Sequence, residues 1–267
     1  MSADPPRSHT ARRAAQDALV RVVHHYGSTP EFVLLGGLVP ELLCEASSAL
    51  HAGTTDVDVQ VNLEIAAGSV NAERLEAALV AAGFEPDGEY VWRWSSLATS
   101  MPLLVKFELL ADLDTAPAQT TVTFDNCGRL GAVNLRGTGF AARDRTRRTL
   151  RGEVDGVETT VKVYVTGLAG FLLAKGAAAG ERRKTKDWYD IAFVLINNDT
   201  GGPSGAATEV NGKFGAGLSG VATMLDDLGA NFASPAAQGP QAYAEQVTLD
   251  HPEVDYATAA ADAVIAV

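Results

Sequence analysis

The most informative stretch of the chain alternates apolar and polar residues with a period of two. Within residues 54–61, Val57 and Val59 alternate with Asp56 and Asp58. Successive side chains of a strand point to opposite faces, so this pattern predicts a strand with two carboxylates side by side on one face. Neighbouring anions repel where water is scarce, so the pair indicates either a bound divalent cation or an edge strand that shows its acids to solvent.

A pair of glycines follows a short apolar run. Residues 32–35 lead directly into Gly36-Gly37, and then into a predicted helix over residues 41–49. Glycines let the backbone approach a phosphate, and the amides at a helix start supply donors. The pair is neither a dinucleotide fingerprint nor a P-loop. It is therefore a candidate triphosphate contact, with an ordinary turn as the alternative.

Helical and strand periodicity predict the other elements of the first part. Residues 11–25 form an amphipathic helix, and Asn71 is the N-cap of a second helix that ends at Ala82. Further strands are predicted over residues 90–94, 103–110 and 160–165, the last after a hairpin turn at Asp155-Gly156. Glu108 lies in an apolar stretch, where a buried carboxylate needs a cation or hydrogen bonds as partners. The alternative is that Glu108 and Lys106 both lie on the solvent-facing side of an edge strand.

Beyond the last predicted strand the period becomes helical. Four polar residues follow one another at spacings of seven, four and four: Lys175, Arg182, Lys186 and Asp190. They share one face if a single helix continues through them, whereas a bend at Gly180 would separate them. A cationic face with acids suits the binding of a triphosphate; the alternative is an exposed helix with surface salt bridges.

The composition after residue 198 shifts to Gly, Ala, Ser and Thr, and only short helices near residues 221–228 and 255–267 are predicted. The pattern as a whole predicts an α/β (α+β) protein. Residues 1–165 would form a domain with a small mixed sheet and an N-terminal helix, and residues 166–267 a helical domain with a Gly/Ala-rich tail.

Net charge limits the classes of function. The chain has 267 residues and a formal net charge of −12, so any polyanion that it binds must meet a local basic patch. One third of its 21 Lys and Arg residues lie between residues 129 and 151: Arg129, Arg136, Arg143, Arg145, Arg147, Arg148 and Arg151. This segment is a candidate nucleic-acid contact, and a solvated loop is the alternative.

The two cysteines, Cys44 and Cys127, are far apart and lack metal-type spacing, which favours a reducing compartment and two small buried side chains. Residues 1–10 contain no apolar signal core, and glycines and lysines interrupt the apolar run over residues 161–179. We expect a soluble cytoplasmic protein that does not enter a membrane.

The order of these motifs resembles a known family. Three motifs in this order resemble the nucleotidyltransferase fold of the DNA-polymerase-beta type: Gly36-Gly37, then Thr55-Asp56-Val57-Asp58, then Val105-Lys106-Phe107-Glu108. Lys175, Arg182 and the run Lys186-Asp187-Trp188-Tyr189-Asp190 resemble the C-terminal signature of the AbiEii/AbiGii toxins, which include the mycobacterial MenT toxins. Together the similar motifs span residues 32–196.

The resemblance implies an active-site cleft between a catalytic N-terminal part and a helical C-terminal part. Two magnesium ions would be held by Asp56, Asp58 and Glu108, and Gly36 and Gly37 would approach the triphosphate. The residues implied to bind nucleotide in the second part are Lys175, Arg182, Lys186 and Asp190, and Lys175 and Asp187 would also be catalytic. The chain departs from the pattern at Gly37, where many relatives have Ser, at Glu108, in place of Asp, and at His51-Ala52-Gly53, near which the toxins often have Arg.

The resemblance also implies a substrate and partners. A nucleoside triphosphate would supply the nucleotide, the 3′ end of tRNA would accept it, and an antitoxin protein would be a further partner. Arg143, Arg145, Arg147 and Arg148 would contact the RNA backbone. The alternatives are nucleotidylation of a protein or small-molecule hydroxyl, and a catalytically silent binding module of the same fold. The five histidines show no arrangement with either cysteine that favours a cysteine hydrolase.

Overall fold

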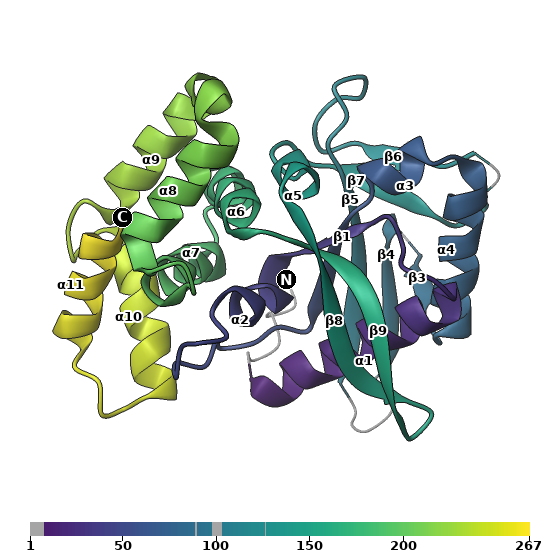
Figure 1. Ribbon diagram of the computed structural model, residues 1–267, viewed down its shortest axis with the longest axis horizontal. Helices are drawn as coiled ribbons and strands as arrows, with labels where there is room; N and C mark the ends of the chain where they lie inside the picture. The colour runs from purple at the N-terminus through teal and green to yellow at the C-terminus, as the bar shows by residue number, and fades with distance from the viewer. Residues whose placement is uncertain (1–7, 89, 98–102, 126) are drawn as a thin grey trace. The chain divides into compact units, whose positions relative to one another are not determined.

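The protein divides into two units. Figure 1 shows it as a computed structural model, which describes residues 8–88, 90–97, 103–125 and 127–267. Unit 1 contains the residues up to Val39 and Gly53–Thr166, and unit 2 contains Pro40–Ala52 and Gly167–Val267. The chain therefore leaves unit 1 soon after the glycine pair and re-enters it just before the acidic strand. Residues 1–7 of the polar N-terminal segment lie outside the described residues.

Unit 1 is built on a mixed sheet of nine strands. Its main path has the order β3-β4-β5-β2-β1-β9-β8, while β7 pairs with β5 and β6 with β7. The α/β class with a mixed sheet is thus confirmed, although the sheet is larger than the small one expected. The strands are β1 (Val33–Leu35), β2 (Asp56–Gln60), β3 (Glu85–Asp87), β4 (Tyr90–Leu97), β5 (Leu104–Ala111), β6 (Thr121–Thr123), β7 (Gly131–Asn134), β8 (Arg145–Val154) and β9 (Val157–Thr166).

The acidic strand β2 lies inside this sheet, between β1, which is antiparallel to it, and β5, which is parallel. Val57 and Val59 are fully buried, while Asp56 and Asp58 are half-buried, which confirms the predicted alternation. The edge-strand alternative is wrong for β2, because it has a hydrogen-bonded neighbour on each side. It is also wrong for the strand that carries Glu108, because β5 lies between β2 and β4.

Helices α1 (His9–Tyr26) and α4 (Ser69–Ala81) pack together over the apolar face of the sheet (Figure 1). The ring of Phe107 in β5 meets Phe32 and Phe84 edge-on, at centroid distances of 6.0 Å and 5.8 Å. The prediction of α1 is confirmed, and the helix ends at Gly27 in a left-handed conformation. Asn71 is not an N-cap, since α4 starts two residues earlier with Gly68 in that position.

The opposite face of the sheet carries the short helices α3 (Asn62–Ala66) and α5 (Gly139–Arg143), while η1 (Gly36–Leu38) directly follows β1. A small apolar cluster formed by Val33, Leu35, Leu110, Val133 and Ala141 is buried there. Leu35 is the register partner of Asp58, so this cluster lies on the same face as the acids of β2. The polar positions of β2 and β5 therefore adjoin a packed apolar patch.

Strands β8 and β9 form a long hairpin with continuous antiparallel register from Arg145↔Thr166 to Val154↔Val157. Its turn is Asp155-Gly156, and both residues have positive φ, of 51° and 80°, as a type I′ turn requires. The predicted hairpin is confirmed. We call this pair of strands the ribbon.

Unit 2 is helical, which confirms the predicted C-terminal class. Its elements are α2 (Pro40–Leu43), α6 (Leu168–Arg182), α7 (Thr185–Asn197), α8 (Gly202–Phe214), η2 (Gly215–Val221), α9 (Ala222–Phe232), α10 (Gln238–Asp250) and α11 (Tyr256–Ala266). Trp188, Tyr189 and Phe232 are among its large buried side chains. Among the described helices, none is both long and apolar enough to cross a membrane.

Two predictions about unit 2 need correction. The helix expected over residues 41–49 stops at Leu43, because the amides of Glu45 and Ala46 donate to the carboxylate of Asp199, at 3.0 Å and 2.9 Å. The Gly-rich segment contains α8 and α10, which were not predicted. Both pack against α7, so their stability comes from tertiary contacts rather than from local propensity.

Candidate functional site

The three predicted metal ligands of unit 1 lie on adjacent strands. Asp58 of β2 is the register partner of Glu108 in β5, and Asp56 is the partner of Lys106. Paired positions of neighbouring strands project to the same face, about 4.8 Å apart in the backbone. The sheet thus brings the three carboxylates and one lysine to one polar face.

Gly36 lies against the carboxylate of Asp58. Its φ is +77°, and a Cβ atom at this position would lie 2.7 Å from Asp58 Cγ and still closer to Oδ2. A Cβ on Gly37 would lie 2.7 Å from the Cβ of Thr54. Any side chain at position 36 would therefore displace the acid, and the glycine turn and the acidic strand form one local structure.

Glu108 has a partner that the sequence analysis did not identify. Arg93 of β4 donates from Nε to Glu108 Oε1 at 2.8 Å, and its guanidinium lies 4.6 Å from the ring centre of Trp92. The two side chains are 27% and 17% exposed, so the pair is partly shielded from water. Within the described part of the chain, no three His, Cys, Asp or Glu side chains are grouped closely enough to form a metal site.

The donor types at this face nevertheless suit magnesium. Mg²⁺ prefers hard oxygen ligands and in nucleotide enzymes usually takes one or two carboxylates plus phosphate oxygens and water. Asp56 and Asp58 supply two such carboxylates. Glu108 would join them through Oε2, because Arg93 donates to Oε1.

Four of the five predicted residues of unit 2 meet in a buried ion network. Lys175 Nζ donates to Asp187 Oδ1 at 2.9 Å and to Asp190 Oδ2 at 2.7 Å. Arg182 Nη2 lies 3.0 Å from each oxygen of Asp187. Asp187 and Asp190 are buried and Lys175 is 8% exposed, while the Arg182 side chain is 38% exposed. Arg182 is therefore the cation of this network with the greatest access to solvent.

Burial and charge act in opposite directions on this network. Burial alone would lower the pKa of Lys175, but the carboxylates of Asp187 and Asp190 outweigh it and raise the pKa above its usual value. Burial would likewise raise the pKa of Asp187, but Lys175 and Arg182 bring it below its usual value. Lys175 and Asp187 are thus both charged at neutral pH.

The single cationic face expected from the helical spacing is wrong. Helix α6 continues through Gly180 and ends at Arg183, which has a left-handed φ of 50°. Lys175 and Arg182 therefore belong to α6, whereas Lys186, which is half-buried, belongs to the first turn of α7. The exposed-helix alternative is also wrong, since the acids of α7 are inside the unit.

His51 is a member of this network that the sequence analysis missed. It is fully buried, and its Nε2 lies 2.9 Å from Asp190 Oδ1. Its ring meets those of Tyr189 and Phe193 at centroid distances of 5.2 Å and 5.0 Å. Because a carboxylate only accepts, Nε2 carries the proton in this contact. His51 and Asp190 are 139 residues apart, so no local pattern could have paired them.

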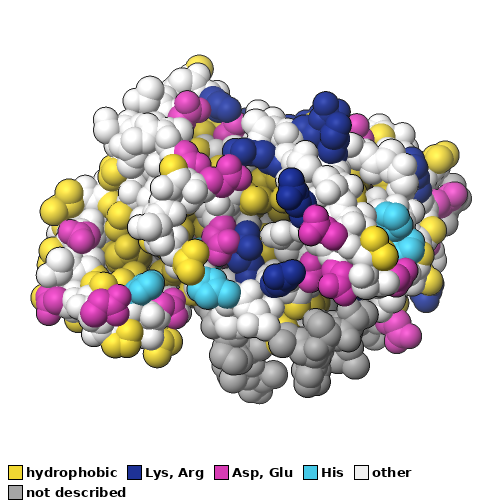
Figure 2. All heavy atoms as spheres, turned by 60° about the horizontal axis from the view of Figure 1, so that its bottom comes forward, with side chains coloured by type: hydrophobic (Ala, Val, Ile, Leu, Met, Phe, Trp, Pro, Cys, Tyr) yellow, Lys and Arg dark blue, Asp and Glu magenta, His cyan; other side chains and the backbone are white. Residues whose placement is uncertain are grey.

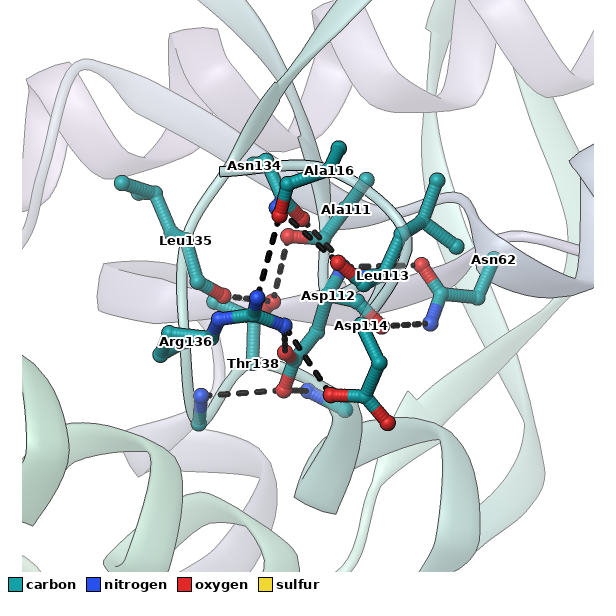
Figure 3. Close-up of polar contacts among 12 residues, drawn as sticks. Asn62, Ala111, Asp112, Leu113, Asp114, Ala116, Asn134, Leu135, Arg136 and Thr138 are labelled. Carbon is teal, nitrogen blue, oxygen red and sulfur yellow. Dashed lines mark hydrogen bonds and ion pairs between the residues drawn. The ribbon is translucent and has the colours of Figure 1, made fainter. Parts of the chain in front are cut away.

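A second polar network holds the end of β5 (Figure 3). Asp112 Oδ2 accepts from the amides of Gly137 and Gly139, at 2.9 Å and 3.1 Å, where α5 begins. The backbone of Asp112 also exchanges two hydrogen bonds with the side chain of Asn62. These contacts tie the end of β5 to α3 and α5.

Asn134 and Arg136 complete that network (Figure 3). The buried Asn134 amide donates to the carbonyls of Leu113, Ala116 and Pro117 and accepts from the amide of Leu113. Arg136 bonds to Asp114 at 3.1 Å and to the Ala116 carbonyl at 3.0 Å. These contacts join the segments that follow β5 and β7 to each other, so we assign this network a structural role.

The structure distributes the arginine-rich segment over several surfaces. Arg143 lies 4.4 Å over the ring of Phe140, and Arg145 pairs with Glu31 at 3.0 Å. Arg147 and Arg148 are consecutive residues of β8 and so project to opposite faces of the ribbon. The four residues predicted to bind RNA therefore do not form one surface. Figure 2 shows Lys and Arg side chains interspersed with Asp and Glu over the face drawn.

Both cysteines are free; Cys44 is buried as expected, whereas Cys127 is only partly buried. Burial raises the pKa of the Cys44 thiol to about 12 and that of Cys127 to about 11. The nucleophilic thiolate is therefore scarce at neutral pH, which argues further against a cysteine hydrolase.

Comparison with known proteins adds no relative: no family model, no curated protein and no solved structure matches the chain.

Proposed function

We propose that this protein is a magnesium-dependent nucleotidyltransferase of the polymerase-beta type that transfers a nucleoside monophosphate from a nucleoside triphosphate to the 3′ end of tRNA. It would act as the toxin of a toxin–antitoxin pair by blocking aminoacylation. The observation that carries the proposal is the close approach of Gly36 to the carboxylate of Asp58, which lies beside Glu108 in register. A glycine turn against paired acids gives a phosphate and a cation adjoining places to bind.

The residues of unit 1 would bind the metal and the triphosphate. Asp56 and Asp58 would hold magnesium. The missing side chains of Gly36 and Gly37 leave room for the side chains of Asp58 and Thr54, so the glycine turn would offer a triphosphate its backbone groups alone. Bound magnesium would lower the pKa of the attacking hydroxyl and neutralise charge on the leaving pyrophosphate. The chain itself supplies position and charge rather than a covalent nucleophile.

The network of unit 2 would supply a fixed cation. Lys175 is held by two carboxylates, so its charge and position are set before any ligand arrives. Arg182 is partly exposed, so it would be the member of this network that is open to a phosphate group. In the transfer, the 3′-hydroxyl oxygen bonds to the α-phosphorus, the bond from that phosphorus to the bridging oxygen breaks, pyrophosphate leaves and the hydroxyl proton passes to water.

A labelled-nucleotide assay tests the proposal. Purified protein, magnesium and total tRNA are incubated with each of the four labelled nucleoside triphosphates in turn. We expect label on tRNA for the natural protein and for Asp226→Asn, an exposed acid of unit 2, and a loss of about 100-fold or more for Asp58→Asn. Label on the protein or on an added protein would reject tRNA as the acceptor but retain the chemistry.

One observation favours a second candidate, a catalytically silent binding module. Glu108 Oε1 accepts from Arg93, whose positive charge offsets part of the negative charge that a metal would need at the third carboxylate. Calorimetry with each triphosphate, with and without magnesium, separates the candidates. Heat of binding that depends on both magnesium and Asp58 supports the enzyme, and its absence, together with unlabelled tRNA, supports the silent module.

A further inference from the structure

The face of the ribbon that points away from α1 carries one cation on each of four successive rungs, where a rung is a pair of register partners on β8 and β9. The register pairs on this face are Arg145↔Thr166, Arg147↔Tyr164, Thr149↔Lys162 and Arg151↔Thr160. Rungs on one face are two residues apart, so neighbouring cations are spaced by roughly 7 Å along the strand, and the row is about 20 Å long. The next rung pairs Glu153 with Glu158, so the row ends at the tip.

Three of the four cations are available to a ligand. Arg147, Arg151 and Lys162 are exposed, and none of them has an ion-pair partner among the residues that the structure describes. Arg145 is engaged instead, by Glu31 and by the ring of Tyr164 at 4.2 Å. The exposed hydroxyls of the ribbon at Thr149 and Thr160 lie between the available cations.

The ribbon presents these side chains from a fixed backbone. Its other face packs on α1 through Leu150 and Val154. Gln16 of α1 donates to the carbonyl of Arg151 at 2.7 Å, and Asp17 accepts from the amide of Glu153 at 3.0 Å. The exposed row is therefore held in place by contacts that leave its charges free.

The row lies on the same face of the sheet as the candidate carboxylates. Asp58 is in register with Leu35 of β1, and Val33 of β1 is in register with Tyr164, the partner of Arg147. Strands β2 and β8 are separated by β1 and β9, which amounts to three strand spacings, or roughly 14 Å. A chain bound along the ribbon would thus lie on the face where transfer would take place.

We propose that Arg147, Arg151 and Lys162 form the surface that binds the sugar–phosphate backbone of an RNA acceptor. The RNA identity rests on the proposed function. The evenly spaced cations with hydroxyls between them match the chemistry of a phosphate backbone, which is bound by Arg, Lys and Thr side chains without reading sequence. Arg143 and Arg148 are not part of this surface.

Fluorescence anisotropy with a labelled single-stranded 20-nucleotide RNA, without triphosphate, tests the proposal. At 0.1 M salt each phosphate contact to a single strand contributes roughly fivefold to affinity through counterion release. The double variant Arg147→Gln/Arg151→Gln should therefore bind about 25-fold more weakly, and the slope of log affinity against log salt should fall in magnitude by about 1.4. The matched control is Arg13→Gln/Arg129→Gln, which removes two exposed arginines elsewhere in unit 1 and should bind RNA as the natural protein does.

Equal affinity for the ribbon variant and the natural protein would overturn the proposal, as would an equal loss in the control. Competition by a poly-glutamate peptide as strong as that by unlabelled RNA would assign the surface to an acidic protein instead. Asp58→Asn should keep its RNA affinity while it loses transfer. Binding that depends on Arg147 and Arg151 without any transfer would therefore reject the enzyme and retain the surface.

Discussion

Asp56 and Asp58 of unit 1 and Asp187 and Asp190 of unit 2 are acids of similar sequence spacing in opposite environments. The first pair is half-buried on a sheet face, beside a glycine whose missing side chain leaves room for the Asp58 carboxylate. The second pair is buried and bonded to Lys175 and to other groups of the unit. The first pair lies on a polar face that a ligand would share, whereas the second is engaged inside its unit by a buried lysine. We therefore expect ligand binding to depend mainly on unit 1 and unfolding free energy to depend more strongly on the ions of unit 2.

The largest effect should follow the loss of Lys175. Lys175→Met would remove the cation that the buried carboxylates of Asp187 and Asp190 share, and removal of one partner of a buried ion pair costs about 3–5 kcal/mol. Hydrogen exchange measured by mass spectrometry should show loss of protection in α6 and α7 first. Lys184→Met, at an exposed site, should change the unfolding free energy by less than about 0.5 kcal/mol. A loss below about 1 kcal/mol for Lys175→Met would mean that the network is not a major source of stability.

The pH dependence of the same network can be predicted from its pKa shifts. The pKa of Asp187 is lowered on folding, so its contribution is complete above the unfolded value of about 3.9 and is lost as pH falls through the folded value. The pKa of Lys175 is raised, so its contribution is complete below about 10.4 and is lost as pH rises through the folded value. The stability advantage of the natural protein over Asp187→Asn should be constant from about pH 5 to 9 and shrink outside it. Urea unfolding at several pH values measures this, and an advantage that varied within that window would contradict the assignment.

His51 should contribute less than Lys175, because its contact with Asp190 is a single hydrogen bond to a charged group, whereas Lys175 bonds to two carboxylates. Such bonds contribute about 1.5–3 kcal/mol, which His51→Leu should lose. His51→Gln keeps a nitrogen donor of similar reach and should recover part of the loss in urea unfolding. If Gln were no better than Leu, the ring contacts of His51 would matter more than its bond to Asp190.

In unit 1, Gly36→Ala should have a smaller effect on stability but a clear effect on binding. A left-handed conformation costs an alanine about 1–2 kcal/mol, and the new methyl group would displace the Asp58 carboxylate. Magnesium-dependent binding of a triphosphate should then be lost in calorimetry. Gly180→Ala, within α6 and with open space around it, should instead raise the unfolding free energy by about 0.5–1 kcal/mol. Unchanged triphosphate binding in Gly36→Ala would show that the glycine turn has no role in binding.

The smallest effect on stability should come from Arg93→Ala. Its ion pair with Glu108 is partly exposed, and such pairs contribute up to about 1 kcal/mol. Removal of Arg93 would release Glu108, so the affinity for magnesium should rise if Glu108 is a ligand. Arg129→Ala, which removes a longer surface pair with Glu76 at 3.9 Å, is the control. Unchanged magnesium affinity in Arg93→Ala would remove Glu108 from the ligand set.

Local periodicity predicted the elements that are regular over several residues. The alternation of β2, the helix α1, the Asp155-Gly156 hairpin and the strand that carries Glu108 all follow from side-chain periods and turn residues. It failed where a residue distant in the chain determined the backbone conformation. Helix α2, for example, ends before Glu45 and Ala46, whose amides donate to the carboxylate of Asp199. It also failed in the Gly-rich segment, because α8 and α10 depend on packing against α7 rather than on helix propensity.

The same distinction between local pattern and tertiary contact applies to the candidate sites. The sequence by itself determined that two acids share one face of a strand, because the period of a strand is local. Only the tertiary structure decided that Asp58 meets Gly36 and Glu108, that Arg93 holds Glu108, and that His51 reaches Asp190. It also decided which arginines of the basic segment share a surface, since strand pairing placed Lys162 among them and turned Arg148 away. Strand register and helix packing join residues that are distant in the chain, and no periodic pattern in a single sequence encodes those pairings.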